Sequence, residues 1–254
     1  MKKFLRRVAA TPLLCPLLAL APAAVLAGPA DYIYSPLVEE GEREIDMKLG
    51  SARAADGEPR ESVATLGYGI GVNRWWFTEF YVIGKNQSPN GTYYDAVEWE
   101  NKFQLTERGE YPFELGALLE IEKPKGPKSG WEVKWGPLFQ TDLTNKIQLN
   151  ANLLIKSYID SDESGLNQML YQLQAKYRWK RELEFGVQAL GDSGGKWTDW
   201  GAGRDQSHRV GPAVFGKLPL EGRSYFRYNA AWLIGTSPGA PRNTVRAQLE
   251  YAFF

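Results

Sequence analysis

Alternation of apolar and polar side chains runs through most of the chain after residue 27, and it restricts the fold more than any other feature. In 44–49, Ile45, Met47 and Leu49 alternate with charged residues, and the apolar residues of 245–253 alternate with Arg246, Gln248 and Glu250. Successive side chains of a β-strand point to opposite faces. Each such stretch therefore predicts a strand with one apolar face and one polar face.

The length of these stretches indicates what the apolar face contacts. They run for about ten residues, which is the length a tilted strand needs to cross bilayer hydrocarbon. Strands of soluble sandwiches are shorter, about five or six residues. After residue 27 the sequence has no run of 18 apolar residues, so it predicts no transmembrane helix there, yet 13% of the chain is aromatic.

Short connections alternate with longer polar ones along the chain, as in barrels with tight turns at one end and loops at the other. Six long and five short connections predict twelve strands, and an even number brings both ends of 42–254 to the same side. An open sheet in lipid would leave unpaired backbone groups, so we expect a closed antiparallel all-β barrel. The expected strands are 42–51, 62–72, 75–84, 93–105, 112–122, 130–141, 146–159, 168–179, 182–190, 207–219, 223–234 and 244–254.

The first 27 residues predict a cleaved secretory signal. Four basic residues come within the first seven, an apolar run follows over 8–26, and Ala27 precedes the expected new N-terminus, Gly28. A retained membrane anchor is the alternative. The only cysteine, Cys15, lies in this leader, so the mature chain would have no disulfide and no thiolate metal site. We expect 28–41 to form a short periplasmic lead.

The charge balance argues against a nucleic-acid partner. The leader takes four of the 30 basic residues with it, which leaves 26 against 30 acidic residues and a net charge of −4. This is not the basic footprint of a nucleic-acid-binding protein. With one histidine and no mature cysteine, the sequence predicts no transition-metal site and no cofactor.

The C-terminal segment carries a family likeness. Apolar or aromatic residues stand at every second place and end in Leu249, Tyr251 and Phe253, followed by Phe254. This resembles the C-terminal signal of bacterial outer-membrane barrel proteins, which the barrel-assembly machinery reads. The resemblance implies an outer-membrane location among lipid and lipopolysaccharide, and the pattern looks most like the small twelve-stranded channels. Phe254 departs from the pattern, because the alternation is in phase with Phe253.

The polar faces should converge on one lumen with the two signs of charge on different walls. The expected acidic wall is Glu79, Glu98, Glu100, Glu114, Glu120, Glu122 and Glu132. The expected basic wall is Lys176, Arg178, Arg209, Lys217, Arg227 and Arg246. A transverse field of this kind favours a narrow channel for small polar or charged solutes. A salt-bridged interior that plugs the barrel is the alternative.

Two further functions remain open from the residues. A structural or adhesive barrel would act through its loops, chiefly 191–206 with Trp197 and Trp200. A barrel hydrolase would centre on His208 beside Ser207, but neighbouring strand residues point to opposite faces, so catalysis is not expected.

One loop segment, Gly191-Asp192-Ser193-Gly194-Gly195, resembles the nucleophile segment of chymotrypsin-like proteases. No histidine precedes it, and a glycine-rich surface loop is the preferred interpretation.

Overall fold

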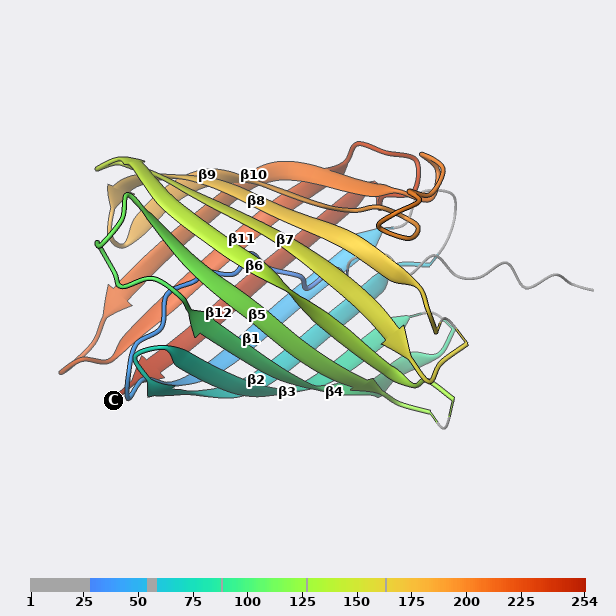
Figure 1. Ribbon diagram of the computed structural model, residues 1–254, viewed down its shortest axis with the longest axis horizontal. Coiled ribbons are helices and arrows are strands. Elements are labelled where there is room, and N and C mark those ends of the chain that lie inside the picture. The colour runs from blue at the N-terminus through green and yellow to red at the C-terminus, as the bar shows by residue number, and fades with distance from the viewer. Residues whose placement is uncertain (1–27, 54–58, 88, 127, 163) are drawn as a thin grey trace, which may run out of the picture.

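The computed structural model describes residues 28–254 except 54–58, 88, 127 and 163, so the predicted leader lies outside the described residues. The described chain forms one closed barrel of twelve antiparallel strands in sequence order (Figure 1). No helix in the described ranges is long and apolar enough to span a membrane. The strands are β1 Arg43–Arg53, β2 Glu61–Asn73, β3 Trp76–Gln87, β4 Gly91–Gln104, β5 Phe113–Pro124, β6 Trp131–Thr144, β7 Ile147–Ile159, β8 Asn167–Lys180, β9 Leu183–Asp192, β10 Ser207–Pro219, β11 Tyr225–Gly235 and β12 Asn243–Phe253.

These strands confirm the predicted closed barrel, with boundaries that differ by a few residues. β3 and β4 extend to Gln87 and from Gly91, so the connection between them is shorter than the expected 85–92. β1 pairs with β12 from Arg43 opposite Phe253 to Arg53 opposite Asn243, which leaves neither strand with a free edge. Phe254 follows β12, and its ring lies 3.7 Å from the guanidinium carbon of Arg223.

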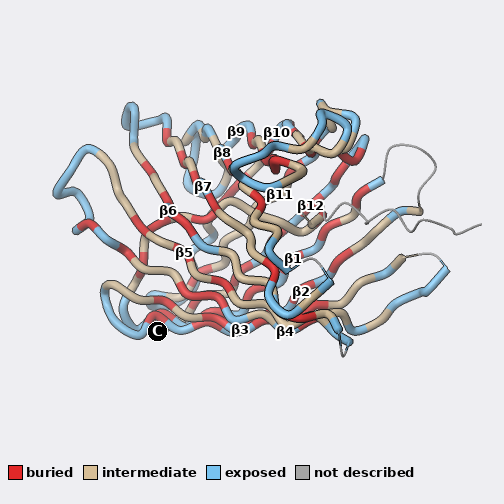
Figure 2. The backbone as a smooth tube through the Cα atoms, turned by 45° about the vertical axis from the view of Figure 1, so that its right-hand side comes forward, coloured by how far each residue is buried: buried red, intermediate tan, exposed pale blue. Residues whose placement is uncertain are grey.

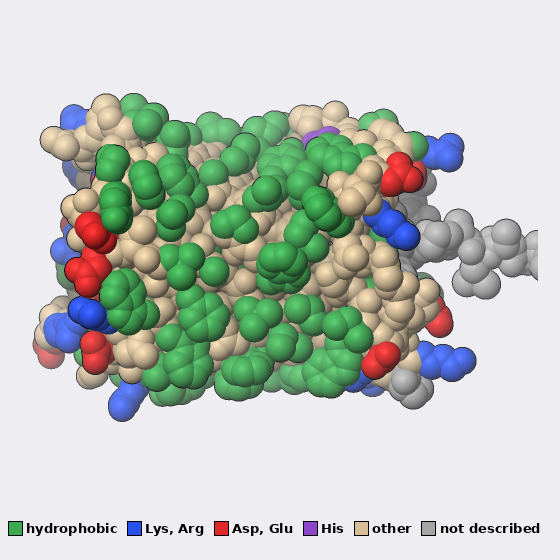
Figure 3. Space-filling view, in the orientation of Figure 1, with side chains coloured by type: hydrophobic (Ala, Val, Ile, Leu, Met, Phe, Trp, Pro, Cys, Tyr) green, Lys and Arg blue, Asp and Glu red, His purple; other side chains and the backbone are tan. Residues whose placement is uncertain are grey.

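The burial pattern is inverted relative to a water-soluble protein. Along β1 the outward Ile45, Met47 and Leu49 are 44%, 39% and 44% exposed, whereas the inward Asp46 is 0% exposed. The same alternation of buried and exposed residues continues around the barrel (Figure 2). Figure 3 shows a broad band of hydrophobic side chains on the visible outer wall, with charged side chains gathered near its two ends. An apolar outside and a polar inside are what lipid requires of a barrel.

The two ends of the barrel differ. Short connections at 74–75, 145–146, 181–182 and 220–224, together with 105–112, define the turn end, on the left in Figure 1. The remaining connections, including 193–206, define the loop end. Both Arg43 and Phe253 lie at the turn end, as the even number of strands requires.

The position of residues 28–42 differs from the predicted periplasmic lead. We expected 28–41 to form a lead outside the barrel, but the structure places this N-terminal segment inside the lumen. Pro29 lies against Gly50 in the loop-end half of β1, and Glu39 lies against Gly71 near the turn end of β2. The segment therefore runs along the barrel before β1 begins. The physical reason is that the wall offers partners for its polar groups, as described below.

Candidate functional site

The lumen is the candidate site, because it collects the charged side chains that the strands turn away from lipid. Inward positions hold the largest fully buried polar side chains, among them Arg209, Glu79, Glu100 and Asp46, of which Glu100 is 2% exposed and the others no more than 1%. Alternation along each strand places them there, since every second residue faces the interior. Charge that is buried in this way needs partners, and the partners decide what the lumen can do.

The acidic wall forms largely where the sequence predicted it. Carboxylate oxygens of Glu98, Glu100 and Glu120 lie within 4.8 Å of one another on β4 and β5. Lys134 of β6 partly neutralises this cluster: its Nζ lies 2.6 and 2.7 Å from the two carboxylate oxygens of Glu120. Glu79, Glu122 and Glu132 lie on the neighbouring inward positions of β3, β5 and β6.

Glu114 stands apart from this cluster. It lies near the turn end, where one carboxylate oxygen accepts a hydrogen bond from the backbone of Gly109 at 2.9 Å and the other from the Thr106 hydroxyl at 3.2 Å. Glu114 therefore stabilises the 105–112 connection and does not belong to the charged cluster on the wall.

The basic wall is broken up by acidic partners that the sequence analysis did not single out. Lys176 pairs with Glu184 at 3.1 Å, and Arg178 pairs with Asp142 at 2.8 Å. Arg227 forms an ion pair with Glu250 of β12.

Lysines interrupt the acidic side in the same manner. Besides Lys134, Lys156 pairs with Glu132, and Lys48 lies 3.5 Å from Asp46. The predicted separation of charge is therefore only partial, because pairs neutralise much of it locally. Their signal was present in the sequence, because each partner occupies an inward position of a barrel strand.

Three of the predicted basic residues have other surroundings. Lys217 places its Nζ 3.3 Å from the centre of the Tyr225 ring. Arg246 is 3% exposed and donates to the side-chain oxygen of Gln188. Arg209 is 1% exposed and donates to the Thr244 hydroxyl at 3.4 Å.

Amide side chains form a hydrogen-bonded ladder across the inner wall. Asn150 of β7 donates to Gln140 of β6 at 3.0 Å, Gln174 of β8 donates to Asn150 at 3.2 Å, and Gln188 of β9 donates to Gln174 at 2.7 Å. Arg246 continues the ladder from β12. Such a row presents alternating donors and acceptors to a polar solute, as well as satisfying the wall itself.

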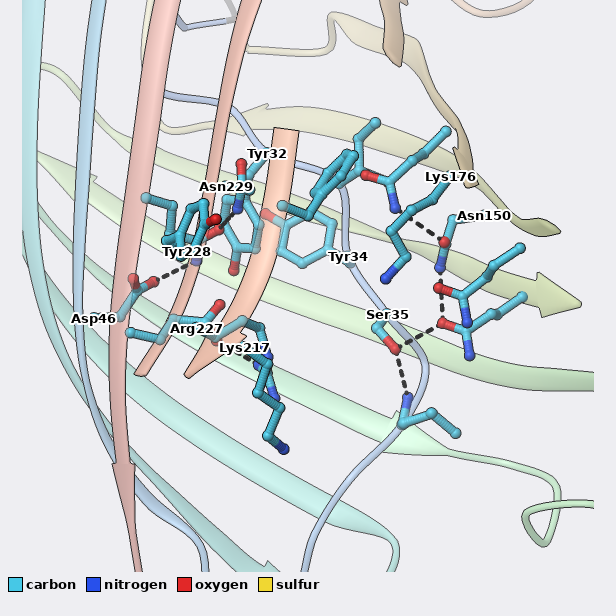
Figure 4. Close-up of a pocket in the computed structure, with 18 of the residues that line it drawn as sticks. Tyr32, Tyr34, Ser35, Asp46, Asn150, Lys176, Lys217, Arg227, Tyr228 and Asn229 are labelled. Atoms are coloured by element: carbon cyan, nitrogen blue, oxygen red, sulfur yellow. Dashed lines mark hydrogen bonds and ion pairs between the residues drawn. The ribbon is translucent and has the colours of Figure 1, made fainter. Parts of the chain in front are cut away.

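The N-terminal segment is bound to this wall by its own polar groups. The hydroxyl of Tyr32 donates to Glu100 and that of Tyr34 to Glu120, each at 2.8 Å. The hydroxyl of Ser35 donates to Gln140 at 3.1 Å. Figure 4 shows Tyr32, Tyr34 and Ser35 among the residues of the inner wall.

Apolar and small inward residues make room for the same segment. Tyr34 packs against four inward leucines, Leu118, Leu138, Leu154 and Leu170. A side chain added at Gly50, Gly71 or Gly116 would collide with Pro29, Glu39 or Pro36 respectively. Leucines and glycines at inward places are thus the sequence signal for a chain segment within the lumen, and the sequence analysis missed it.

A cavity of about 470 Å³ remains between the N-terminal segment and the wall. Its lining includes the ladder amides and charged residues near the turn end, among them Lys102, Arg178, Arg181, Lys217, Arg227 and Glu250. Toward the loop end the space is filled: Ala30 packs against Val63, Ile83 and Ala96. Free space in the lumen is therefore greatest toward the turn end.

Ser207 and His208, the candidate catalytic pair of the sequence analysis, do not contact each other. Ser207 faces inward and is 0% exposed, whereas the ring of His208 faces away from it, with Nδ1 3.0 Å from the Tyr171 hydroxyl and Nε2 3.1 Å from the Gln206 side-chain oxygen. Ser193 is 1% exposed, and its hydroxyl donates to the carbonyl of Gly195 at 2.9 Å, so it fastens the loop. Trp197 and Trp200 remain 53% and 49% exposed on that loop.

Comparison with known proteins identifies an architecture. No protein-family model and no curated protein sequence matches the chain. Among solved structures, the fold is similar to an outer membrane channel from Pseudomonas putida F1, with 12% identity, 89% of this chain and 98% of that chain covered, and a TM-score of 0.60. It is also similar to the NanC porin (11% identity, 83% and 99% covered, TM-score 0.54). A third similar fold is the translocator domain of the autotransporter NalP from Neisseria meningitidis (9% identity, 85% and 89% covered, TM-score 0.50). The chain has the closed antiparallel barrel fold of Gram-negative outer-membrane proteins.

Proposed function

We propose that this protein is an outer-membrane barrel whose lumen passes small polar or charged solutes. The observation that carries the proposal is the cavity of about 470 Å³, which is lined by ion pairs and by the amide ladder. A cavity of this size with polar lining can hold water and small polar solutes. Two of the similar solved folds, a channel and a porin, support the proposal.

The proposal includes a route to the membrane. A leader over 1–27 is removed, and the assembly machinery reads the end of β12, with Leu249, Tyr251 and Phe253 on its outward face and Phe254 following. Short turns then face the periplasm and the loops face outside. In this orientation the cavity lies toward the periplasm and the filled half of the lumen lies toward the exterior. No chemical reaction is part of the proposal.

The N-terminal segment sets the conditions for passage. It occupies the lumen from Pro29 to Glu39, and the loop-end half is packed around Ala30. Solutes therefore pass only when this segment shifts, and the conductance of a single barrel should be small and intermittent.

A second function has an observation in its favour. Because the same segment fills the loop-end half of the lumen, a closed barrel that acts through its external loops is the alternative. The exposed Trp197 and Trp200 would then provide contact surface. This alternative predicts no conductance under any condition that leaves the barrel folded.

Planar bilayer recording separates the two. The mature protein is inserted at low density, and current is recorded with and without the substitutions Tyr32→Ala and Tyr34→Ala, which remove both tyrosine hydrogen bonds. A channel shows discrete steps whose frequency or size increases in the double variant. Silence in both proteins, with folding verified by resistance to detergent unfolding at room temperature, would refute the channel and favour the closed barrel.

A further inference from the structure

A groove of about 490 Å³ lies on the outer wall near the loop end, across β12, β1, β2, β3 and the start of β4. Most of its lining residues occupy outward positions, which alternate with the inward ones along each strand. The cross-strand register aligns Ala247, Leu49, Ala64 and Gly84 in one outward row through the groove.

The groove exists because three of the four residues in this row, all except Leu49, are alanine or glycine, whereas the next row has only large side chains. The next outward row toward the barrel middle is Leu249, Met47, Leu66 and Val82 in the same register. Alanine and glycine thus leave a depression beside a bulky apolar row. A depression on a lipid-facing wall is filled by hydrocarbon, since water there would have no polar partner.

The rim toward the loop end is polar. The hydroxyls of Ser51 and Ser62 lie 2.9 Å apart, and the side chain of Asn86 donates to the Thr92 hydroxyl at 2.6 Å. Arg60 donates to the Ser51 hydroxyl at 3.2 Å. An apolar floor that ends in a row of hydroxyls and amides matches an amphiphile, with its chain along the floor and its head at the rim.

Two arginines, Arg53 and Arg60, lie just beyond the rim toward the loop end, and Arg60 contacts the rim at Ser51. Arg53 ends β1 on the exposed face, and the β1–β2 register, continued by one residue, sets it opposite Arg60. Neither arginine forms an ion pair with a described residue. Like charges opposite each other repel unless an anion lies between them, and guanidinium groups bind phosphate oxygens in a bidentate manner.

We propose that this groove holds the lipid A part of a lipopolysaccharide molecule, with one acyl chain on the alanine and glycine floor and a phosphate between Arg53 and Arg60. The inference rests on the proposed outer-membrane orientation, in which the loop end meets the outer leaflet. It is independent of conduction, because the groove lies on the opposite side of the wall from the lumen.

The test is lipid-dependent stability of the full mature protein in detergent micelles. The temperature at which the barrel unfolds on gel electrophoresis is measured with rising amounts of purified lipid A, and separately with phosphatidylethanolamine. A ligand that binds only the folded barrel raises this temperature as its concentration rises. Lipid A should raise the wild-type value in a saturable way, and phosphatidylethanolamine should have a much smaller effect.

Substitutions identify the site. Ala64→Leu with Ala247→Leu fills the floor, and Arg53→Gln with Arg60→Gln removes the charge; each pair should weaken the apparent lipid A affinity at least tenfold. Ala175→Leu, an exposed outward alanine on β8, is the matched control and should respond as wild type does. Equal responses to lipid A in all variants, or equal responses to both lipids in wild type, would overturn the proposal.

The mass of the protein in detergent distinguishes a lipid site from an interface between copies. The bilayer current distinguishes failure of lipid binding from failure of conduction. If wild type is a dimer by mass in detergent and the floor-filling variant is a monomer, the groove is an interface between copies and the lipid proposal fails. Lipid A binding that is lost in the variants while bilayer currents persist supports the groove and leaves conduction intact. Binding without any current in any protein would refute the channel alone.

Discussion

The hydroxyl of Tyr34 donates a hydrogen bond of 2.8 Å to Glu120, a residue 86 positions further along the chain, inside the barrel. Lys134 holds the same carboxylate from β6. The N-terminal segment is thus attached to a charged pair of the wall. Its attachment and the electrostatics of the lumen therefore depend on each other, so a change to either should be measurable in the other.

Tyr34→Ala should loosen the segment and increase current. The change removes a buried hydrogen bond to a charged group, a contribution of about 1.5–3 kcal/mol, together with the packing on the inward leucines. Planar bilayer recording should show more frequent or larger open steps. Tyr68→Phe on the outer wall, where the tyrosine is 46% exposed, is the control and should not change the current. An unchanged current in Tyr34→Ala would mean that the segment does not limit passage.

Gly71→Ala should displace the N-terminal segment by a steric clash, without removing any of its side-chain hydrogen bonds. A methyl group there would lie 1.9 Å from the backbone oxygen of Glu39, so the segment must move away from β2. We expect increased access of the segment to protease added to the detergent-solubilised barrel, measured by N-terminal fragments in mass spectrometry. Gly203→Ala is the control, because nothing lies within 4 Å of the added methyl group. Equal cleavage in wild type and Gly71→Ala would contradict the close approach of Glu39 and Gly71.

Lys134→Met should destabilise the barrel strongly. It removes the lysine that holds Glu120 in a cluster with Glu98 and Glu100, and breaking one side of a buried pair costs about 3–5 kcal/mol. The midpoint of denaturant unfolding, followed by tryptophan fluorescence in detergent, should fall. Adding Glu120→Gln to Lys134→Met should restore part of the loss, because the uncompensated charge is gone.

An exposed pair provides the comparison for this measurement. Arg108 lies 3.4 Å from Glu39, and their side chains are 49% and 37% exposed. Arg108→Met should cost about 1 kcal/mol or less, as is usual for pairs open to water. A loss in Lys134→Met no larger than this would show that Glu120 does not depend on Lys134.

The sequence predicted which side chains of the barrel wall face inward, but it did not reveal the N-terminal segment in the lumen. Period-two alternation determines which side chain faces lipid, so Asp46 and Arg209 could be placed inward from the pattern alone. The pairing of Arg227 with Glu250 depends on the register between two neighbouring strands, and alternation within one strand does not encode that. The position of Tyr34 depends on contacts between a segment without periodicity and leucines from four strands, which no local pattern reveals.

Arg227→Glu should change the ion selectivity of any current that the barrel carries. Arg227 lines the cavity, its side chain is 43% exposed, and it is paired with Glu250. Reversal puts two carboxylates side by side in place of an ion pair, so the lumen becomes more negative and favours cations. Under a potassium chloride gradient, the reversal potential should move toward the potassium equilibrium potential, and this shift should shrink as salt screens the charge.

Two further reversals locate the path. Arg246→Glu should shift the reversal potential less, because Arg246 lines the same cavity but is only 3% exposed and donates to Gln188. Arg74→Glu, at a turn where the side chain is 67% exposed, should leave the reversal potential unchanged. If Arg227→Glu also leaves it unchanged while the barrel still conducts, ions do not pass this part of the wall, and the cavity at the turn end is not part of the route.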